Sequence, residues 1–319
     1  MHSLDLNPTH PAGMGNKLLP PVVLIGFNRP RQLARVVDTV AAAGVPVIYF
    51  VSDGPRTSRS GEADLVSESR RHLDRLGAST EVHRIFSTTN LGCRERIQSG
   101  LDEVFSREER AIILEDDCVP DLSFFRYCQE LLDRYRSANC VGAVCGTNFC
   151  LPSAKAPHSY SFSQYPFVWG WATWSRVWSH YDRNARSWSE RETRDRVRAL
   201  VHDDSEYRFW NAAFSAIRGG YDTWDHQLAL TFFDSGLLSA VPASNLVSNV
   251  GFGPEGTHTI GTSSLDQLPA EPLTFPLVHP LVVAANRAFD ADVARSQYRL
   301  SRFAAAKRRG QRIRSSAGR

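Results

Sequence analysis

Continuous apolar runs alternate with amphipathic stretches along the first 115 residues. The runs "VVLIG", "VIYFV" and "AIIL" predict buried strands, and "STEVHRIFS" predicts a fourth. These expected strands lie within residues 20–30, 46–56, 111–115 and 79–87. Apolar residues at helical spacing predict helices over 31–44, 62–77 and 94–108. Apolar strands separated by helices are typical of a parallel sheet covered on both faces, so we expect an α/β fold.

Polar residues follow three of the expected strands at the point where each strand ends. The letters are "NRP" at 28–30, "SDG" at 52–54 and "EDD" at 115–117. In a parallel sheet the carboxyl ends of the strands share one edge, and ligands bind beyond that edge. The sequence therefore predicts a site built from these three tips.

The second half of the chain is less regular. We expect helices over 122–138 and 221–236, a strand over 140–148, and a strand followed by a glycine-rich loop within 239–259. A proline-studded strap occupies 268–280, and residues 1–19 are expected to be disordered. Three tryptophans, Trp171, Trp174 and Trp178, have the i, i+3, i+7 spacing of a helix packed in a core. Indole rings also pack on sugars, which is the alternative for them and for Trp169.

Composition and charge exclude several classes of protein. The chain has 319 residues, 42% of them hydrophobic, and a net charge of +3. Seven basic residues lie in 301–319, which leaves residues 1–300 with a net charge of −4, so a basic nucleic-acid-binding face is not expected. The six cysteines have no C-x-x-C spacing and therefore predict no structural zinc site. With no signal peptide and no membrane span expected, we predict a cytoplasmic protein with reduced thiols.

The carboxylates of Glu115, Asp116 and Asp117 follow a buried strand directly. Adjacent carboxylates raise one another's pKa unless a cation joins them, and Mg²⁺ or Mn²⁺ is the natural partner of oxygen ligands. Such ions take further ligands from substrate phosphates. The alternative is a solvated acidic turn that caps the helix from residue 122. The chain contains no P-loop and no G-x-G-x-x-G, so phosphates would be bound through side chains and a metal.

The stretches "VLIGFNRP", "FVSDGP" and "AIILEDDCVPDLSFFRYCQELL", followed by "GWATW", "TWDHQ" and "FGPEGTHT", resemble the GT-A glycosyltransferases. The match is to the inverting N-acetylglucosaminyltransferase type that starts complex N-glycan branching, and to bacterial family-2-like relatives. The resemblance covers about residues 20–260. It implies a Rossmann-like GT-A fold, a mostly parallel sheet with helices on both faces and an acceptor-side extension in the second half.

The resemblance also implies a division of the chain. Residues 20–150 correspond to the nucleotide-sugar-binding half of one GT-A domain and 151–265 to its acceptor-side half. A disordered N-terminus over 1–19 and a C-terminal strap and basic tail over 266–319 complete the predicted organisation.

The donor site that the resemblance implies draws on the three strand tips. Asp117 would ligate Mn²⁺ or Mg²⁺, Asp116 would lie close by, and Glu115 would bind the ribose. Arg29 would lie near the nucleotide, and Asp53 would bind the uracil edge. Further along the chain, Trp171 would contact the donor sugar, and His258 would approach the metal or the diphosphate. Surface or turn positions are the alternatives for Arg29, Asp53 and His258.

The catalytic base expected from the resemblance lies in "YDTWDHQ". The family has two acidic residues after the tryptophan, whereas this chain has Asp225 and then His226. Asp225 is the best candidate, and His226 and Asp222 remain open. Acidic residues in the first turn of a helix also favour its dipole, which is the structural alternative.

The resemblance implies that the chain is a metal-dependent inverting glycosyltransferase. The donor would be a nucleotide-sugar, UDP-linked, and the acceptor a glycan or lipid-linked glycan of bacterial surface polysaccharide biosynthesis. A non-catalytic nucleotide- or sugar-binding protein and a sugar-phosphate nucleotidyltransferase are the rivals. The basic C-terminal tail is expected to be solvated, or to make weak peripheral contact with the inner face of an anionic membrane.

Overall fold

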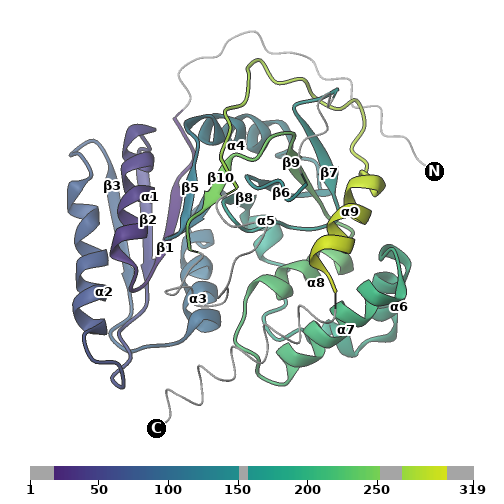
Figure 1. The fold of residues 1–319 in the computed structure, drawn as a ribbon, viewed down its shortest axis with the longest axis horizontal. Coiled ribbons are helices and arrows are strands. Elements are labelled where there is room, and N and C mark those ends of the chain that lie inside the picture. Colours follow the sequence, from purple (N-terminus) through teal and green to yellow (C-terminus); the bar gives the residue numbers. More distant parts are fainter. Residues whose placement is uncertain (1–17, 151–156, 252–267, 300–319) are drawn as a thin grey trace.

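The computed structural model describes residues 18–150, 157–251 and 268–299. It contains one large sheet flanked by helices, and a small two-stranded sheet beside it (Figure 1). The strands are β1 Val22–Gly26, β2 Val47–Ser52, β3 Glu81–Phe86, β4 Arg110–Glu115, β5 Cys118–Pro120, β6 Val141–Cys145, β7 Tyr160–Ser163, β8 Trp171–Trp174, β9 Leu238–Pro242 and β10 Val247–Asn249. Three predictions lie outside the described residues. They concern residues 1–17 of the expected disordered N-terminus, His258, and the basic tail over 301–319.

The eight-stranded sheet has the order β3-β2-β1-β4-β8-β6-β9-β7. Strands β3, β2, β1 and β4 are parallel, and β6 is parallel to β9. Strand β8 runs antiparallel to both β4 and β6, and β7 runs antiparallel to β9. The predicted α/β fold with a mostly parallel sheet is confirmed. The sheet is continuous across residue 150, and the division there stays a prediction.

The helices occupy both faces of the sheet. They are α1 Pro30–Ala42, α2 Glu62–Arg71, α3 Cys93–Phe105, α4 Leu122–Arg134, α5 Ser175–Trp178, α6 Arg191–Leu200, α7 Asp204–Arg218, α8 Asp225–Ser235 and α9 Arg287–Gln297, with 3-10 turns at His72–Arg75 and Ser187–Ser189. In the described ranges no helix combines the length and the apolar character of a bilayer span.

Two neighbouring residues of β2 show why the helices lie on opposite faces. Side chains alternate along a strand, so Phe50 and Val51 point to opposite sides of the sheet. A Cβ on Gly26 would meet both Phe50 and Leu33 of α1, whereas a Cβ on Gly100 of α3 would lie 2.4 Å from Val51. Helix α1 therefore covers the Phe50 face of the sheet and α3 covers the Val51 face. The close contact with Val51 leaves no room for a larger residue at Gly100.

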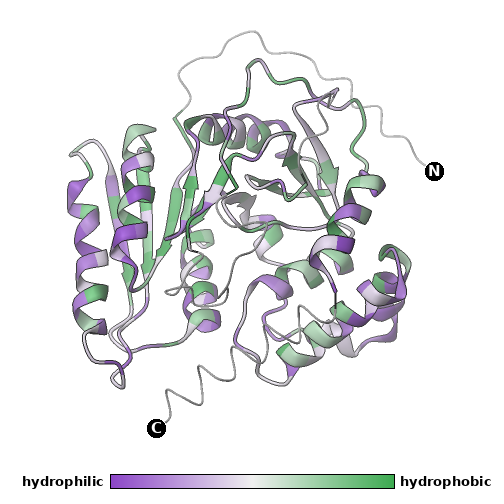
Figure 2. Ribbon diagram, viewed as in Figure 1, coloured by the Kyte–Doolittle hydropathy of each residue, from purple (hydrophilic) through white to green (hydrophobic). Residues whose placement is uncertain are grey.

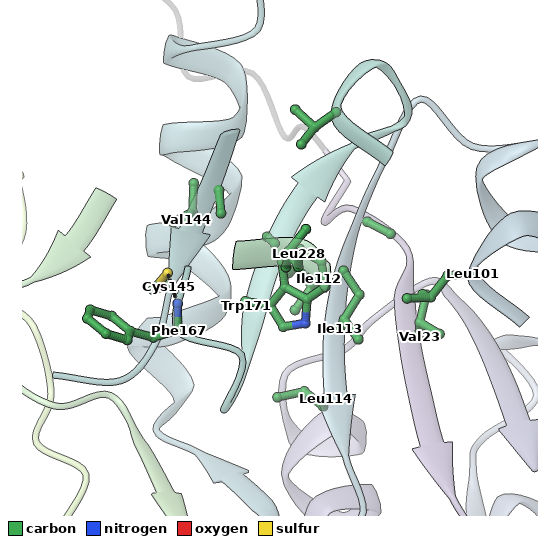
Figure 3. Packing of buried hydrophobic residues seen from close by; sticks show 14 of the residues in the cluster. Val23, Leu101, Ile112, Ile113, Leu114, Val144, Cys145, Phe167, Trp171 and Leu228 are labelled. Atoms are coloured by element: carbon green, nitrogen blue, oxygen red, sulfur yellow. Dashed lines mark hydrogen bonds between the residues drawn. The ribbon is translucent and has the colours of Figure 1, made fainter. Parts of the chain in front are cut away.

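The centre of the sheet is strongly apolar, as Figure 2 shows for the strands of the first half. Close by, the indole of Trp171 lies among Ile112 and Ile113 of β4 and Leu228 of α8 (Figure 3). Trp171 and Trp174 are each 1% exposed and Trp178 is 5% exposed. The predicted core packing of these tryptophans is right, but the predicted helical spacing is wrong for the first two, because they lie on strand β8.

The C-terminal helix α9 is attached to the sheet through a buried carboxylate. Asp290 accepts hydrogen bonds from Ser163 Oγ at 2.6 Å and from the backbone N–H of Gln164 at 3.2 Å. Burial raises the pKa of Asp290 to about 6, although Ser163, Gln164, His202 and Arg287 oppose this shift. The folded state thus binds the Asp290 proton more tightly than the unfolded chain does.

Stability from protonated Asp290 is present below its ordinary pKa of 3.8 and is lost as the pH rises through about 6. Between pH 4 and 7 we expect the wild type to lose about 2 kcal/mol of unfolding free energy relative to Asp290→Asn. Urea unfolding at a series of pH values checks this. Asp292→Asn, exposed on the same helix, is the control and should follow the wild type. A pH-independent difference between wild type and Asp290→Asn would contradict the prediction.

Candidate active site

The three polar strand tips lie at one edge of the sheet. Strand β1 lies between β2 and β4, and all three are parallel. Gly26 is opposite Ser52 on one side, and Ile25 is opposite Glu115 on the other. The loops that follow these strands are therefore neighbours, as the sequence predicted.

Arg29 bridges two of the three carboxylates. Its Nη1 donates to Asp117 Oδ2 at 2.7 Å and to Asp116 Oδ1 at 3.4 Å. The side chains of Arg29, Asp116 and Asp117 are 13%, 11% and 15% exposed. The backbone N–H of Phe27 also donates to Asp116 Oδ2 at 3.2 Å. The loop after β1 thus supplies both a positive charge and an amide donor to the acidic loop after β4, which is formed by Glu115, Asp116 and Asp117.

The acidic loop carries more negative charge than Arg29 compensates. Burial raises the pKa of Glu115 well above its ordinary value, and the charges of Asp117 and Asp116 add to the effect. Burial also raises the pKa of Asp116 to about 6, against the opposing effect of Arg29. No residue in the described part of the chain donates a hydrogen bond to the Glu115 carboxylate. One guanidinium therefore balances only part of the negative charge.

A strand from the second half of the chain closes on Asp117. Strand β10 pairs with β5 in antiparallel register, with Asn249 opposite Cys118 (Figure 1). The backbone N–H of Val250 then donates to the carbonyl of Asp117 at 2.8 Å. A Cβ on Gly251 would lie only 2.0 Å from Asp117 Oδ2, so glycine is required there. Gly251, which precedes the segment that contains His258, therefore lies against the Asp117 carboxylate.

Asp53 holds the loop that precedes α3. Its carboxylate accepts backbone N–H groups from Gly54, Leu91 and Gly92 at 2.9–3.0 Å, and Asn90 Nδ2 at 3.0 Å. Burial raises its pKa, and the backbone donors oppose the shift. In this arrangement the carboxylate anchors the loop. Its predicted contact with a uracil edge stays a prediction, and it would require some of these bonds to be exchanged.

The three candidates for the base occupy different environments. Asp222 Oδ1 accepts the backbone N–H of Arg94 at 3.0 Å and so caps the first turn of α3. The ring of His226 packs edge-on against Phe209 and Trp210, at centroid distances of 6.0 and 5.9 Å.

Asp225 begins α8, and its charge contributes to the raised pKa of Glu115 and to that of the Cys93 thiol. Burial is the larger cause of the shift at Cys93, and Glu115 and Asp222 also contribute. Asp225 thus interacts electrostatically with Glu115, while the ring of His226 packs against aromatic rings of α7.

Trp171 connects the core to this region. Its ring stacks on Trp224 at 5.9 Å with an interplanar angle of 27°. Trp224 is 4% exposed and directly precedes Asp225. The Nε1–H of Trp171 is buried and has no acceptor among the described residues. Trp171 therefore helps to fix the position of Asp225 through its contact with Trp224. The contact of Trp171 with a donor sugar stays a prediction.

The acidic loop fits a hard divalent cation in its chemistry. Its donors are carboxylate oxygens, and the Arg29 guanidinium already stands as a cation 2.7 Å from Asp117 Oδ2. Within the described ranges, no group of three or more His, Cys, Asp or Glu side chains is arranged to hold a metal ion. Asp117, with Asp116 beside it, would therefore hold Mg²⁺ or Mn²⁺ only together with ligands from phosphates, water or other parts of the chain.

Sequence reasoning missed two features of this edge. One is the pairing of Arg29 with Asp116 and Asp117, which the adjacency of the first and fourth strands could have indicated. The other is a clamp between loops, in which Glu62 accepts hydrogen bonds from Asn28 Nδ2 at 3.0 Å and from the backbone of Arg56 at 2.7 Å. No pattern in the letters distinguishes Glu62 from any acidic residue at the start of a helix.

Comparisons with known proteins find similarity only in structure. No family model and no curated protein sequence matches the chain. HddC from Yersinia pseudotuberculosis, solved as a complex with GMP-PN, is similar over 51% of this chain and 80% of its own, with 10% identity and a TM-score of 0.34. The 4-diphosphocytidyl-2C-methyl-D-erythritol synthase of Anaerococcus prevotii is similar over 59% and 82%, with 12% identity and a TM-score of 0.33.

A UDP-glucose pyrophosphorylase in complex with UDP-glucose is similar over 52% of this chain and 80% of its own. Its identity is 8% and its TM-score is 0.31. At values this low, none of these structures assigns the chain to a family. The α/β fold rests on the sheet and helices described above.

Proposed function

We propose that this protein is a metal-dependent inverting glycosyltransferase that moves a sugar from a UDP-linked donor to a glycan acceptor. The observation that carries the proposal is the meeting of three elements at one sheet edge. Strand β10 pairs with β5 beside the acidic loop after β4. Trp224, which precedes Asp225 at the start of α8, stacks on Trp171, and Trp171 lies opposite Ile113 of β4. These elements come from distant parts of the chain. A solvated acidic turn would require none of these partners.

In the proposed site, Asp117 holds the cation, with Asp116 beside it and His258 as a further candidate ligand. When bound, the metal would act as a Lewis acid on the departing diphosphate. Glu115 would bind the ribose and Asp53 the uracil. The remaining steps belong to side chains of this chain.

Asp225 would act as the base. The acceptor hydroxyl oxygen forms a bond to the anomeric carbon while the bond from that carbon to the diphosphate oxygen breaks. The hydroxyl proton passes to the Asp225 carboxylate, and the sugar is transferred with inversion. Trp171, through Trp224, would hold Asp225 in place for this attack. Surface-polysaccharide glycans, free or lipid-linked, are the proposed acceptors.

Calorimetric titration tests the donor site. We expect UDP to bind with Mn²⁺ present, to bind at least 10-fold more weakly without it, and GDP to bind more weakly than UDP. Asp117→Asn, which keeps the shape of the side chain, should abolish the Mn²⁺-dependent part of UDP binding. Asp64→Asn, at an exposed position of α2, is the matched control. Equal UDP binding by Asp117→Asn and the wild type would show that Asp117 holds no metal.

Product analysis separates the rival functions. A glycosyltransferase with a UDP-sugar and Mn²⁺ releases UDP, at least slowly by hydrolysis. A sugar-phosphate nucleotidyltransferase instead consumes a nucleoside triphosphate and releases pyrophosphate. A binding protein on the same fold does neither. The loop after β1 favours the first function, because Phe27, Asn28 and Arg29 lead directly into α1 at Pro30, with no glycine-rich basic loop.

A further inference from the structure

Arg29 occupies the position that the proposed site needs for its metal. Its guanidinium covers Asp117 Oδ2 at 2.7 Å, on the oxygen that also lies against Gly251. Burial alone would lower the pKa of Arg29, but Asp116 and Asp117 overcome that effect and raise it. The guanidinium therefore stays charged and serves as the counter-cation of the acidic loop in this structure.

A divalent cation and this guanidinium are incompatible neighbours. Both are positively charged, and sharing the Asp117 carboxylate would place them within a few ångströms of each other at a site that screens charge less than water does, so they repel strongly. Arg29 directly precedes α1, which begins at Pro30, and its backbone is therefore fixed by the helix while its long side chain is not. The side chain can move without displacing β1 or α1.

A nucleotide diphosphate supplies the place to which Arg29 can move. The planar guanidinium fork matches phosphate oxygens, and charge-assisted bonds to phosphate are strong. In the proposed site the diphosphate would also ligate the metal, so both ligands would bind at the same edge of the sheet. The loss of the Asp117 contact is then offset by a contact with the donor.

We propose that Arg29 is an exchangeable counter-cation: it holds Asp116 and Asp117 in the free protein and transfers to the donor diphosphate when the metal binds Asp117. This inference rests on the proposed function for the identity of the diphosphate. It implies that the free protein binds Mn²⁺ weakly, and that Mn²⁺ and UDP strengthen each other's binding by the same factor. The coupling would limit binding of metal without donor.

Binding measurements on Arg29→Gln test the exchange. Glutamine removes the charge and keeps a hydrogen-bond donor for Asp117. We expect this variant to bind Mn²⁺ alone at least 10-fold more tightly than the wild type, measured by the EPR signal of free Mn²⁺. UDP at saturating Mn²⁺ should bind at least 10-fold more weakly, so the coupling between the two ligands falls. Arg29→Lys keeps the charge and should bind Mn²⁺ alone as weakly as the wild type does.

Arg110→Met is the matched control, because Arg110 pairs with Asp133 at the opposite end of the same strand β4. It should leave Mn²⁺ affinity unchanged. If Arg29→Gln unfolds without metal, the rise of its thermal midpoint with added Mn²⁺ gives the affinity instead.

The exchange is overturned if Arg29→Gln binds Mn²⁺ alone no more tightly than the wild type. The proposed function can stand in that case, provided that the wild type binds UDP with Mn²⁺. Conversely, tighter Mn²⁺ binding by Arg29→Gln, with no UDP binding by the wild type, supports the counter-cation role. That result would contradict the proposal that the donor is UDP-linked.

Discussion

Asp225→Asn is expected to transfer sugar about 10²–10⁴-fold more slowly than the wild type, with UDP and Mn²⁺ binding within 3-fold of normal. The reason is that asparagine keeps the shape of the side chain but cannot accept the acceptor hydroxyl proton. Its effect should therefore appear in kcat, while donor binding at the acidic loop is retained. Initial rates with a UDP-sugar and acceptor, beside calorimetric titration of UDP, measure the two quantities.

The neighbouring candidates distinguish a base from a structural acid. His226→Gln should reduce kcat less than Asp225→Asn does, because the ring of His226 packs against Phe209 and Trp210. Asp222→Ala should lower stability through the lost cap of α3, and its kcat should fall less than that of Asp225→Asn. A larger loss of kcat in the His226 variant would move the role of base to that histidine.

Gly170→Ala is expected to destabilise the fold by about 2–5 kcal/mol. The backbone of Gly170 has φ +68°, a conformation that favours glycine, and an added Cβ would lie 2.6 Å from Val247 Cγ2 and 3.3 Å from Leu114 Cδ2. Since Val247 is the first residue of β10, the clash would also push β10 away from β5. We expect weaker Mn²⁺-dependent UDP binding in the same variant.

Gly44→Ala separates backbone strain from crowding. Gly44 has the same φ of +68°, but an added Cβ would meet no atom within 4 Å. The cost at Gly44 should therefore be only about 1–2 kcal/mol, from the strained backbone. Urea unfolding of both variants gives the difference. Equal costs would mean that Val247 moves aside freely and that β10 is not tightly packed.

Hydrophobic patterning predicts the first half of the fold well. The strands expected within 20–30, 46–56, 79–87 and 111–115 are β1, β2, β3 and β4, and the three helices between them are present. These elements are long, and their apolar residues are nearly all buried, so the sequence period is clear. Gly44, the last residue of the range expected for the first helix, follows the end of α1 with φ +68°, and its N–H is bonded to the carbonyl of Ala41 at 3.1 Å.

Elements whose pairing partner is remote in sequence were harder to predict. Strand β8 carries Trp171 and Trp174, whose spacing fits a helix but whose burial comes from packing between β4 and β6. Strands β5 and β10 have three residues each, too short for any period. The same holds for Arg29, because its contact with Asp117 depends on which strands are neighbours. The sequence predicted which residue types form the site, but not which of these residues contact each other.

The sequence order of the partners around Asp117 has a consequence for the nascent chain. Arg29 and the four parallel strands β1 to β4 are all synthesised by the time residue 117 has been added. Strand β10, which places Gly251 against Asp117, follows only at residues 247–249. A ribosome-bound chain therefore already contains the guanidinium that balances part of the charge of its acidic loop. It can assemble this half of the sheet without waiting for the second half or for a metal ion.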